Sequence, residues 1–189
     1  MRLRDKAVIV TGGANGIGRA ICELFAEQGA SVMVADIDVD GGEVTLDRIK
    51  AGGGEATFVQ TDISKEADVQ EVVQATVDAY GTVNVLVNDA AAFVFGTIED
   101  VTREDWLRVM DVNVFGSSSC VKHVVPLMKA AGGGSIVNIA SISSFIAQPA
   151  FIPYNASKGA LLQITRCLAL EFEWVPDFVC NLQQRGSHQ

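Results

Sequence analysis

The chain has 189 residues, of which 49% are hydrophobic and 20% charged, a composition typical of one folded globular domain with its own packed core. It carries 14 Lys and Arg against 23 Asp and Glu, a net charge of -9 that disfavours binding to nucleic acid or to anionic membrane surfaces. No apolar run reaches the roughly 20 residues needed to cross a bilayer. We therefore expect a cytoplasmic protein with neither nucleic acid nor membrane as a partner.

Cysteine and histidine are too few and too scattered to indicate a metal site, so no metal is expected. No C-x-x-C pair occurs, and we expect reduced, mostly buried thiols. The residues concerned are Cys22, Cys120, Cys167, Cys180, His123 and His188.

Five apolar, β-rich runs alternate with stretches long enough to form crossover helices. This alternation predicts an α/β fold with a doubly wound, Rossmann-like parallel sheet and helices on both faces. The runs are nearly continuous in apolar side chains, as expected for strands that helices cover on both sides. In chain order, strands are predicted at 7–11, 31–36, 55–61, 83–88 and 135–140, and helices at 16–29, 43–50, 65–80, 103–131 and 154–173.

The end of the chain differs in character from the rest. Residues 1–173 are predicted to form one nucleotide-binding domain, whereas Pro176 breaks the helical pattern and residues 183–189 are polar and unpatterned. We therefore expect a loosely ordered tail over 174–189. A short strand at 177–180 is the alternative for part of it.

A glycine-rich turn directly follows the first predicted strand and opens the first predicted helix. Its spacing is Gly12-x3-Gly16-x-Gly18, which differs from the generic G-x-G-x-x-G dinucleotide fingerprint. Glycines permit a tight turn and a close backbone approach, and the helix N-terminus supplies N–H groups that favour an anion. Since structural turns use the same residues, the turn predicts a pyrophosphate site only together with the residues that follow.

Asp36 ends the second predicted strand, 18 residues beyond Gly18. An acidic side chain at this place accepts hydrogen bonds from the adenosine ribose hydroxyls and repels a 2′-phosphate. The plain structural alternative is an aspartate that caps a helix or stabilises a turn. Asp36 therefore favours NAD, with NADP the less suitable cofactor.

Ser141 stands near the end of the fifth predicted strand, and Tyr154 follows 13 residues later at the start of a helix. Lys158 lies four residues after Tyr154, so both side chains share one helix face and the ammonium stabilises the phenolate. A phenol held in this way acts as a general acid or base, and Ser141 orients the substrate oxygen. A lone Tyr-x3-Lys pair is usually a solvated helix face, so this reading depends on the glycine turn upstream.

From about Leu3 to Leu170 the chain resembles the compact, single-domain branch of the short-chain dehydrogenase/reductase family. The resemblance implies that Asp62 and Ile63 contact adenine and that Asn88 supports the cofactor cleft. It also implies that Tyr154 and Lys158 hold the cofactor. The remaining implied cofactor-binding residues are Gly12, Asn15, Gly16, Ile17, Gly18 and Asp36.

The catalytic set that the resemblance implies is Asn113, Ser141, Tyr154 and Lys158. In this set Tyr154 is the acid/base, Lys158 also holds the nicotinamide ribose, and Asn113 relays protons through water. The substrate is then a small alcohol or carbonyl compound, and the chain forms a homo-oligomer through its helices at 103–131 and 154–173.

Two features depart from the family pattern. Asp89 stands where the family usually has a second asparagine, so an extra negative charge lies near the cofactor cleft. After Leu170 the family's sixth strand, Pro-Gly cofactor segment, substrate-covering loop and seventh strand are not recognisable, and the C-terminal strands are expected to be missing or altered. The fifth strand would then be an exposed sheet edge unless the tail pairs with it.

Three functions remain open. The first is an NAD(H)-dependent oxidoreductase that transfers hydride between nicotinamide and an alcohol or ketone. The second is a shortened, catalytically inactive dinucleotide-binding or interaction protein. The third is an extended sugar-nucleotide epimerase or dehydratase, which the glycine spacing and the length of 189 residues disfavour.

Overall fold

The protein contains a single parallel sheet with the strand order β3-β2-β1-β4-β5-β6. The computed structural model describes residues 1–172 and 178–185. Every neighbouring pair of strands runs parallel, which confirms the predicted doubly wound α/β class. The strands are β1 (Ala7–Thr11), β2 (Ser31–Asp36), β3 (Glu55–Gln60), β4 (Val85–Asn88), β5 (Gly134–Ser141) and β6 (Phe178–Arg185).

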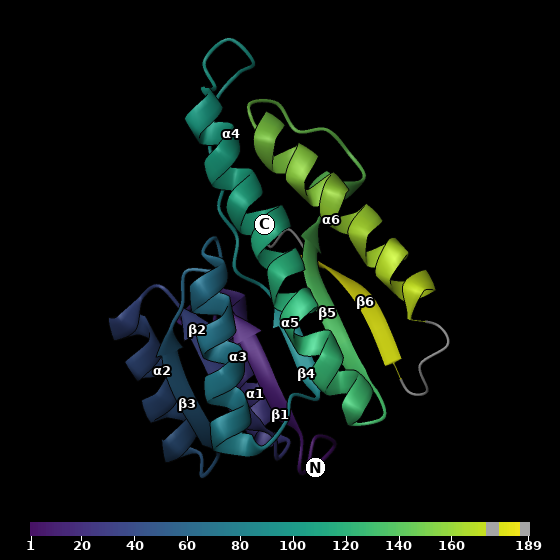
Figure 1. The fold of residues 1–189 in the computed structure, drawn as a ribbon. Helices are drawn as coiled ribbons and strands as arrows, with labels where there is room; N and C mark the ends of the chain where they lie inside the picture. Colours follow the sequence, from purple (N-terminus) through teal and green to yellow (C-terminus); the bar gives the residue numbers. More distant parts are fainter. Residues whose placement is uncertain (173–177, 186–189) are drawn as a thin grey trace.

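Helices cover both faces of this sheet (Figure 1). One apolar core joins the sheet to α3 and α5, and a second joins it to α1 and α2 on the opposite face. The helices are α1 (Gly16–Glu27), α2 (Val39–Ala51), α3 (Glu66–Tyr80), α4 (Arg103–Met110), α5 (Ser117–Ala130) and α6 (Ile152–Glu171), with a π-helical segment η1 (Asp111–Gly116) and a 3₁₀ turn η2 (Ile142–Ser144).

The strand order reverses direction at β1. The chain passes from β1 outward through β2 to β3 and then returns to place β4 on the other side of β1. In parallel sheets of this kind, the loops that leave the carboxyl ends of the two central strands diverge and open a crevice between them. Thr11 and Asn88 end these two strands in matched register, so the crevice lies directly above them.

The C-terminal segment adds a sixth strand. Residues 178–185 form β6, which pairs in parallel with the full length of β5 from Gly134 to Ser141. The sequence predicted a loosely ordered tail, with pairing to the fifth strand as the alternative. For residues 178–185 the structure shows this pairing. Ladder hydrogen bonds use backbone groups alone, so polar side chains do not prevent a segment from covering an open edge. The expectations for residues 173–177 and 186–189 fall outside the described residues.

The cysteine thiols differ in burial, and the buried ones have raised pKa values. Burial raises the pKa of Cys22 to about 12, with a further rise from nearby carboxylates that include Asp89 and Asp36. Burial also raises the pKa of Cys120 to about 12, whereas Cys167 is exposed. Among residues 1–172 there is no cluster of three or more His, Cys, Asp or Glu placed to hold a metal ion. Within the same range, no helix combines the length and apolar character of a membrane span.

Candidate active site

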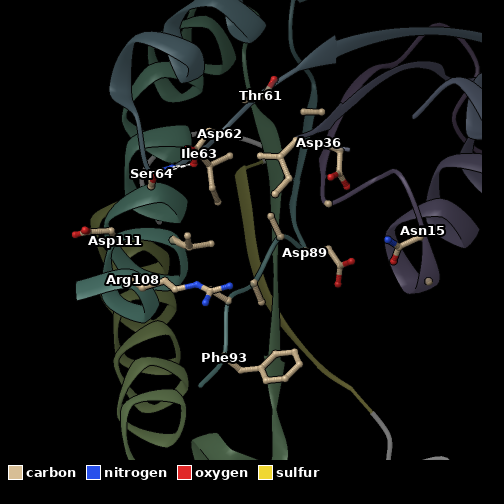
Figure 2. A pocket seen from close by; sticks show the side chains of 18 of the residues that line it. Asn15, Asp36, Thr61, Asp62, Ile63, Ser64, Asp89, Phe93, Arg108 and Asp111 are labelled. Atoms are coloured by element: carbon tan, nitrogen blue, oxygen red, sulfur yellow. Dashed lines mark hydrogen bonds between the residues drawn. The ribbon is translucent and has the colours of Figure 1, made fainter. Parts of the chain in front are cut away.

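A cleft of about 580 Å³ opens at the carboxyl ends of the strands, where the crevice is expected. Figure 2 shows side chains entering it from the glycine turn, from the ends of β2 and β3, from the segment after β4 and from α4. Several residues expected to bind a dinucleotide line this cleft, namely Gly12, Asn15, Gly16, Ile17, Asp36, Asp62 and Ile63.

In the glycine turn, the main chain packs closely against neighbouring main chain at two glycines, Gly12 and Gly18. Gly12 has a φ of +75°, and a Cβ at this position would lie 2.8 Å from the Ala90 nitrogen. A Cβ on Gly18 would lie 2.7 Å from the carbonyl carbon of Gly12. At Gly16, by contrast, no atom lies within 4 Å of where a Cβ would stand. This open space at the first turn of α1, beside its free N–H groups, fits an anionic pyrophosphate.

Asp36 serves the turn and also faces the cleft. Its Oδ2 accepts a hydrogen bond from the Ala14 N–H at 2.9 Å, and its Oδ1 accepts one from the Asp38 N–H at 3.0 Å. The structural alternative for this aspartate is therefore partly correct, because the carboxylate stabilises the glycine turn. Each carboxylate oxygen retains a further lone pair, so Asp36 can still accept hydrogen bonds from ribose hydroxyls.

Asp62 and Ile63 form the far wall of the cleft, after β3. The Asp62 Oδ1 accepts hydrogen bonds from the Ser64 N–H and hydroxyl at 3.1 and 2.6 Å, and its Oδ2 pairs with Lys65 at 3.2 Å. Burial raises the pKa of Asp62, but the Ser64 hydrogen bonds and the Lys65 ammonium outweigh it and hold the pKa below its usual range. Ile63 is buried and supplies an apolar surface there.

Of the expected site residues, six lie outside the residues that line the cleft: Gly18, Asn88, Asn113, Ser141, Tyr154 and Lys158. The buried Asn88 amide donates to the Asn138 Oδ1 at 2.9 Å, and the Asn138 amide donates to the Thr165 hydroxyl at 2.9 Å. This chain of hydrogen bonds joins β4, β5 and α6 beneath the cleft. Asn88 is thus part of a buried hydrogen-bond network, and Gly18 packs closely against Gly12 within the turn.

Asn113 lies in the π-helical segment η1 and is 1% exposed. Its Oδ1 accepts from the Ala92 N–H at 2.7 Å, while its Nδ2 donates to the Ala92 carbonyl at 2.8 Å and to the Ser157 hydroxyl at 2.9 Å. Ser157 in turn donates to the Tyr154 carbonyl at 2.8 Å. Asn113 therefore ties the segment after β4 to the first turn of α6.

The other three expected catalytic residues come from two neighbouring elements, Ser141 from the end of β5 and Tyr154 and Lys158 from α6. The Ser141 hydroxyl accepts from the Ser143 N–H at 3.2 Å. Lys158 is 1% exposed, and its Nζ donates to the Ile139 carbonyl at 2.7 Å and lies 5.7 Å from the centroid of the Tyr154 ring. The Lys158 side chain is thus buried beside the half-buried Tyr154 ring.

Asp89, Arg108 and Phe93 are among the further residues that line the cleft, and of these three only Asp89 was noted in the sequence. Asp89 is 4% exposed, and Figure 2 shows its carboxylate within the cleft. Arg108 reaches the cleft from α4, and Phe93 lies after β4. Arg108 lies on α4, and no sequence signal fixes which face of that helix turns toward the cleft. Phe93 lies outside any periodic segment, so it too carries no sequence signal.

An Asp89→Asn variant is expected to bind NADH several-fold more tightly. The carboxylate Oδ2 lies 3.0 Å from the position of a Cβ on Gly18, so it stands close to the turn that faces an anionic pyrophosphate. Two negative charges in a partly desolvated cleft repel each other by on the order of 1 kcal/mol. Fluorescence titration with NADH measures the change, with Asp47→Asn on the exposed face of α2 as the control for net charge. Weaker binding would mean that the carboxylate is itself a required hydrogen-bond acceptor.

The fold and the cleft define a Rossmann-type α/β protein with a glycine turn at the sheet's switch point. The family model described as short chain dehydrogenase matches residues 6–174. The chain belongs to this family of oxidoreductases.

Curated proteins are similar to this chain over most of its length. An uncharacterized oxidoreductase of Thermotoga maritima is 42% identical over 89% of this chain and 66% of its own length. The NADP-dependent (R)-specific alcohol dehydrogenase of Lentilactobacillus kefiri is 39% identical over 90% of this chain and 68% of its own. Across the first curated relatives, the chain spans 63–68% of the relative's length.

A solved structure shows the same fold. The short-chain dehydrogenase/reductase of Burkholderia phymatum, crystallised in complex with NAD, superposes with a TM-score of 0.93 at 32% identity. The match covers 97% of this chain and 66% of the other. The compact branch expected from the sequence is confirmed at the level of family and fold.

Proposed function

We propose that the protein is an NAD(H)-dependent oxidoreductase that interconverts a small alcohol and the corresponding carbonyl compound. The observation that carries this proposal is the buried Lys158 ammonium 5.7 Å from the Tyr154 ring, on the same helix and beside a dinucleotide-sized cleft. The chain's partners would then be its small-molecule substrate and, as in the expected homo-oligomer, further copies of itself.

Residues from three elements would hold the cofactor. The first turn of α1, entered through Gly12 and Gly16, would receive the pyrophosphate, Asp36 the adenosine ribose, and Asp62 with Ile63 the adenine. When bound, NAD(H) supplies the hydride acceptor or donor of the reaction.

The chain's own residues would handle the proton. In the direction of oxidation, the Tyr154 phenolate takes the hydroxyl proton of the substrate, and in the direction of reduction the phenol returns it. Lys158 stabilises the phenolate through its nearby charge, and the Ser141 hydroxyl orients the substrate oxygen. Asn113 holds the first turn of α6 through Ser157, and we assign to it the relay of protons through water.

Asp36 favours NAD over NADP in this proposal. The relative from Lentilactobacillus kefiri is NADP-dependent, whereas the structure from Burkholderia phymatum contains NAD, so both cofactors occur among similar proteins. Here the Asp36 carboxylate lines the cleft, where it would repel a 2′-phosphate.

An Asp36→Ala variant is expected to bind NADH at least about tenfold more weakly and to lose its discrimination against NADPH. The loss combines two effects, because the carboxylate accepts from the Ala14 N–H in addition to facing the ribose. Parallel titrations with NADH and NADPH measure both effects, and Asp38→Asn, which alters the neighbouring helix cap, serves as the control. Equal affinity for the two nucleotides in the unaltered chain would refute the assignment of Asp36.

The proposal as a whole is tested by NADH titration followed by a screen of alcohols and ketones for turnover. Saturable NADH binding with turnover supports it. A second candidate, dinucleotide binding without turnover, is favoured by the exposure of the aromatic side chains beside Tyr154, because an open pocket does not exclude water from the reaction. Tight NADH binding with no turnover of any substrate would favour this second candidate.

A further inference from the structure

Four aromatic rings form a closed set of contacts on the side of the cleft where Tyr154 stands. Phe93 and Phe95 lie with their ring centroids 5.4 Å apart, and Phe95 and Phe151 lie 4.3 Å apart. Tyr154 completes the set at 6.0 Å from Phe151 and 6.4 Å from Phe93. All four pairs are edge-on. Three of the centroid distances lie in the range of about 4.5–7 Å where aromatic rings attract one another, and the Phe95–Phe151 pair is slightly closer. We call these four residues the aromatic quartet.

The quartet joins two segments that are distant in sequence. Phe93 and Phe95 follow β4, whereas Phe151 directly precedes α6. The backbone connects them, because the Gly96 N–H donates to the Ala150 carbonyl at 3.0 Å and Gly96 forms a parallel bridge with Phe151. Ala150 adopts a φ of +59°, a conformation that residues other than glycine rarely adopt. The rings are therefore held in place by the main chain as well as by their mutual contacts.

The position of the quartet relates it to the cleft. Phe93 lines the cleft, while Tyr154 carries the hydroxyl proposed as acid/base, so the rings extend from the cleft to the reacting group. Phe93 is nevertheless 54% exposed and Phe95 64% exposed. Contiguous exposed apolar surface beside a cleft is typical of a ligand-binding site, whereas single exposed apolar residues are ordinary.

The chemistry of the quartet restricts what it can bind. The only polar side-chain atom of the quartet is the Tyr154 hydroxyl. Two charged side chains, Asp89 and Arg108, line the same cleft as Phe93 but belong to no ring contact of the quartet. Ring edges and faces of this kind bind a flat apolar group, and they offer no partner to a carboxylate or to several hydroxyls.

We propose that the aromatic quartet binds an aromatic group attached to the reacting carbon, so that the substrates are aryl alcohols and aryl ketones. This inference rests on the proposed oxidoreductase function and adds the substrate class to it. Phe93 and Phe95 are the specificity-determining residues, and neither takes part in the proton transfer.

The test compares two ketones of different shape. With NADH present, the chain is expected to reduce acetophenone with a kcat/KM at least tenfold above that for 2-butanone. Phe93→Ala is expected to lower this ratio about tenfold while the NADH dissociation constant stays within twofold, and Phe95→Ala is the second variant should the first fail to fold. Phe115→Ala removes an equally exposed phenylalanine that does not line the cleft, and it is expected to leave the ratio unchanged.

Binding provides a readout that does not depend on turnover. Calorimetric titration of acetophenone into the NADH-loaded chain is expected to show saturable binding that Phe93→Ala weakens and Phe115→Ala does not. If this binding occurs without turnover, the quartet is confirmed as a binding site for aryl groups and the proposed oxidoreductase activity fails. Equal kcat/KM for the two ketones, or absence of acetophenone binding, would overturn the inference. A self-association that Phe93→Ala abolishes would also overturn it, because a second copy of the chain would then cover the quartet.

Discussion

A Tyr154→Phe variant is expected to lose turnover by about 10²- to 10⁴-fold, the range that general acid–base catalysis contributes. The substitution removes only the phenolic hydroxyl, so the ring keeps its contacts with Phe93 and Phe151 and its place near Lys158. The transferable proton disappears while the site keeps its shape. Initial rates with NADH and a ketone, together with an NADH titration, measure the two effects separately.

The NADH dissociation constant of this variant should remain within about twofold, since a mutation that removes a transition-state interaction lowers kcat without altering ground-state binding. Tyr80→Phe is the matched control, because it deletes a phenolic hydroxyl at a residue outside the cleft. Full turnover by Tyr154→Phe would remove Tyr154 from the mechanism, and a parallel loss of NADH binding would make its role structural.

Replacing Gly18 by alanine is expected to destabilise the fold by about 1–3 kcal/mol, the usual cost of forcing an extra methyl group into a packed site. The new Cβ would meet the Gly12 carbonyl group and would stand 3.0 Å from the Asp89 Oδ2. Backbone atoms cannot turn aside as a flexible side chain does, so the turn itself must move. We expect NADH affinity to fall at least about tenfold with the stability, as measured by chemical denaturation and fluorescence titration.

Gly159→Ala is the matched control within a helix. No atom lies within 4 Å of the position of its Cβ, and the residue lies inside α6. Alanine there is expected to stabilise the fold by about 0.5–1 kcal/mol, because glycine loses more backbone entropy on folding. If Gly18→Ala lowered neither the free energy of unfolding nor the NADH affinity, the close approach within the glycine turn would not matter for stability or binding.

The strands were the most predictable part of the fold. β1 and β2 occupy the predicted ranges 7–11 and 31–36 because a strand buried on both faces must be continuously apolar, and this pattern is visible in one dimension. α2 begins at Val39, four residues before the predicted start at 43. Gly41 and Gly42 lower helix propensity there, but Asp38 caps the helix by accepting from the Gly41 N–H.

The candidate site could be predicted from the sequence where its residues are only a few positions apart. Tyr154 and Lys158 lie on one helix, so their separation of four residues already places them together. The aromatic quartet could not be foreseen, because its contacts join the segment after β4 to the start of α6 through tertiary structure alone. Arg108 depended likewise on which face of α4 turns toward the cleft.

The π-helical segment has a consequence for how this chain tolerates change in length. An α-helix turns by about 100° per residue, and a π-type turn accommodates one residue more than an α-type turn. η1 therefore sets the buried face of α5 out of phase with that of α4. Deleting a single residue between Asp111 and Gly116 would rotate Asn113 away from Ser157, or turn the buried side chains of α5 off the sheet, without altering any of those residues. A substitution along this stretch alters the contacts of one side chain, whereas a one-residue insertion or deletion would disrupt the site and the core together.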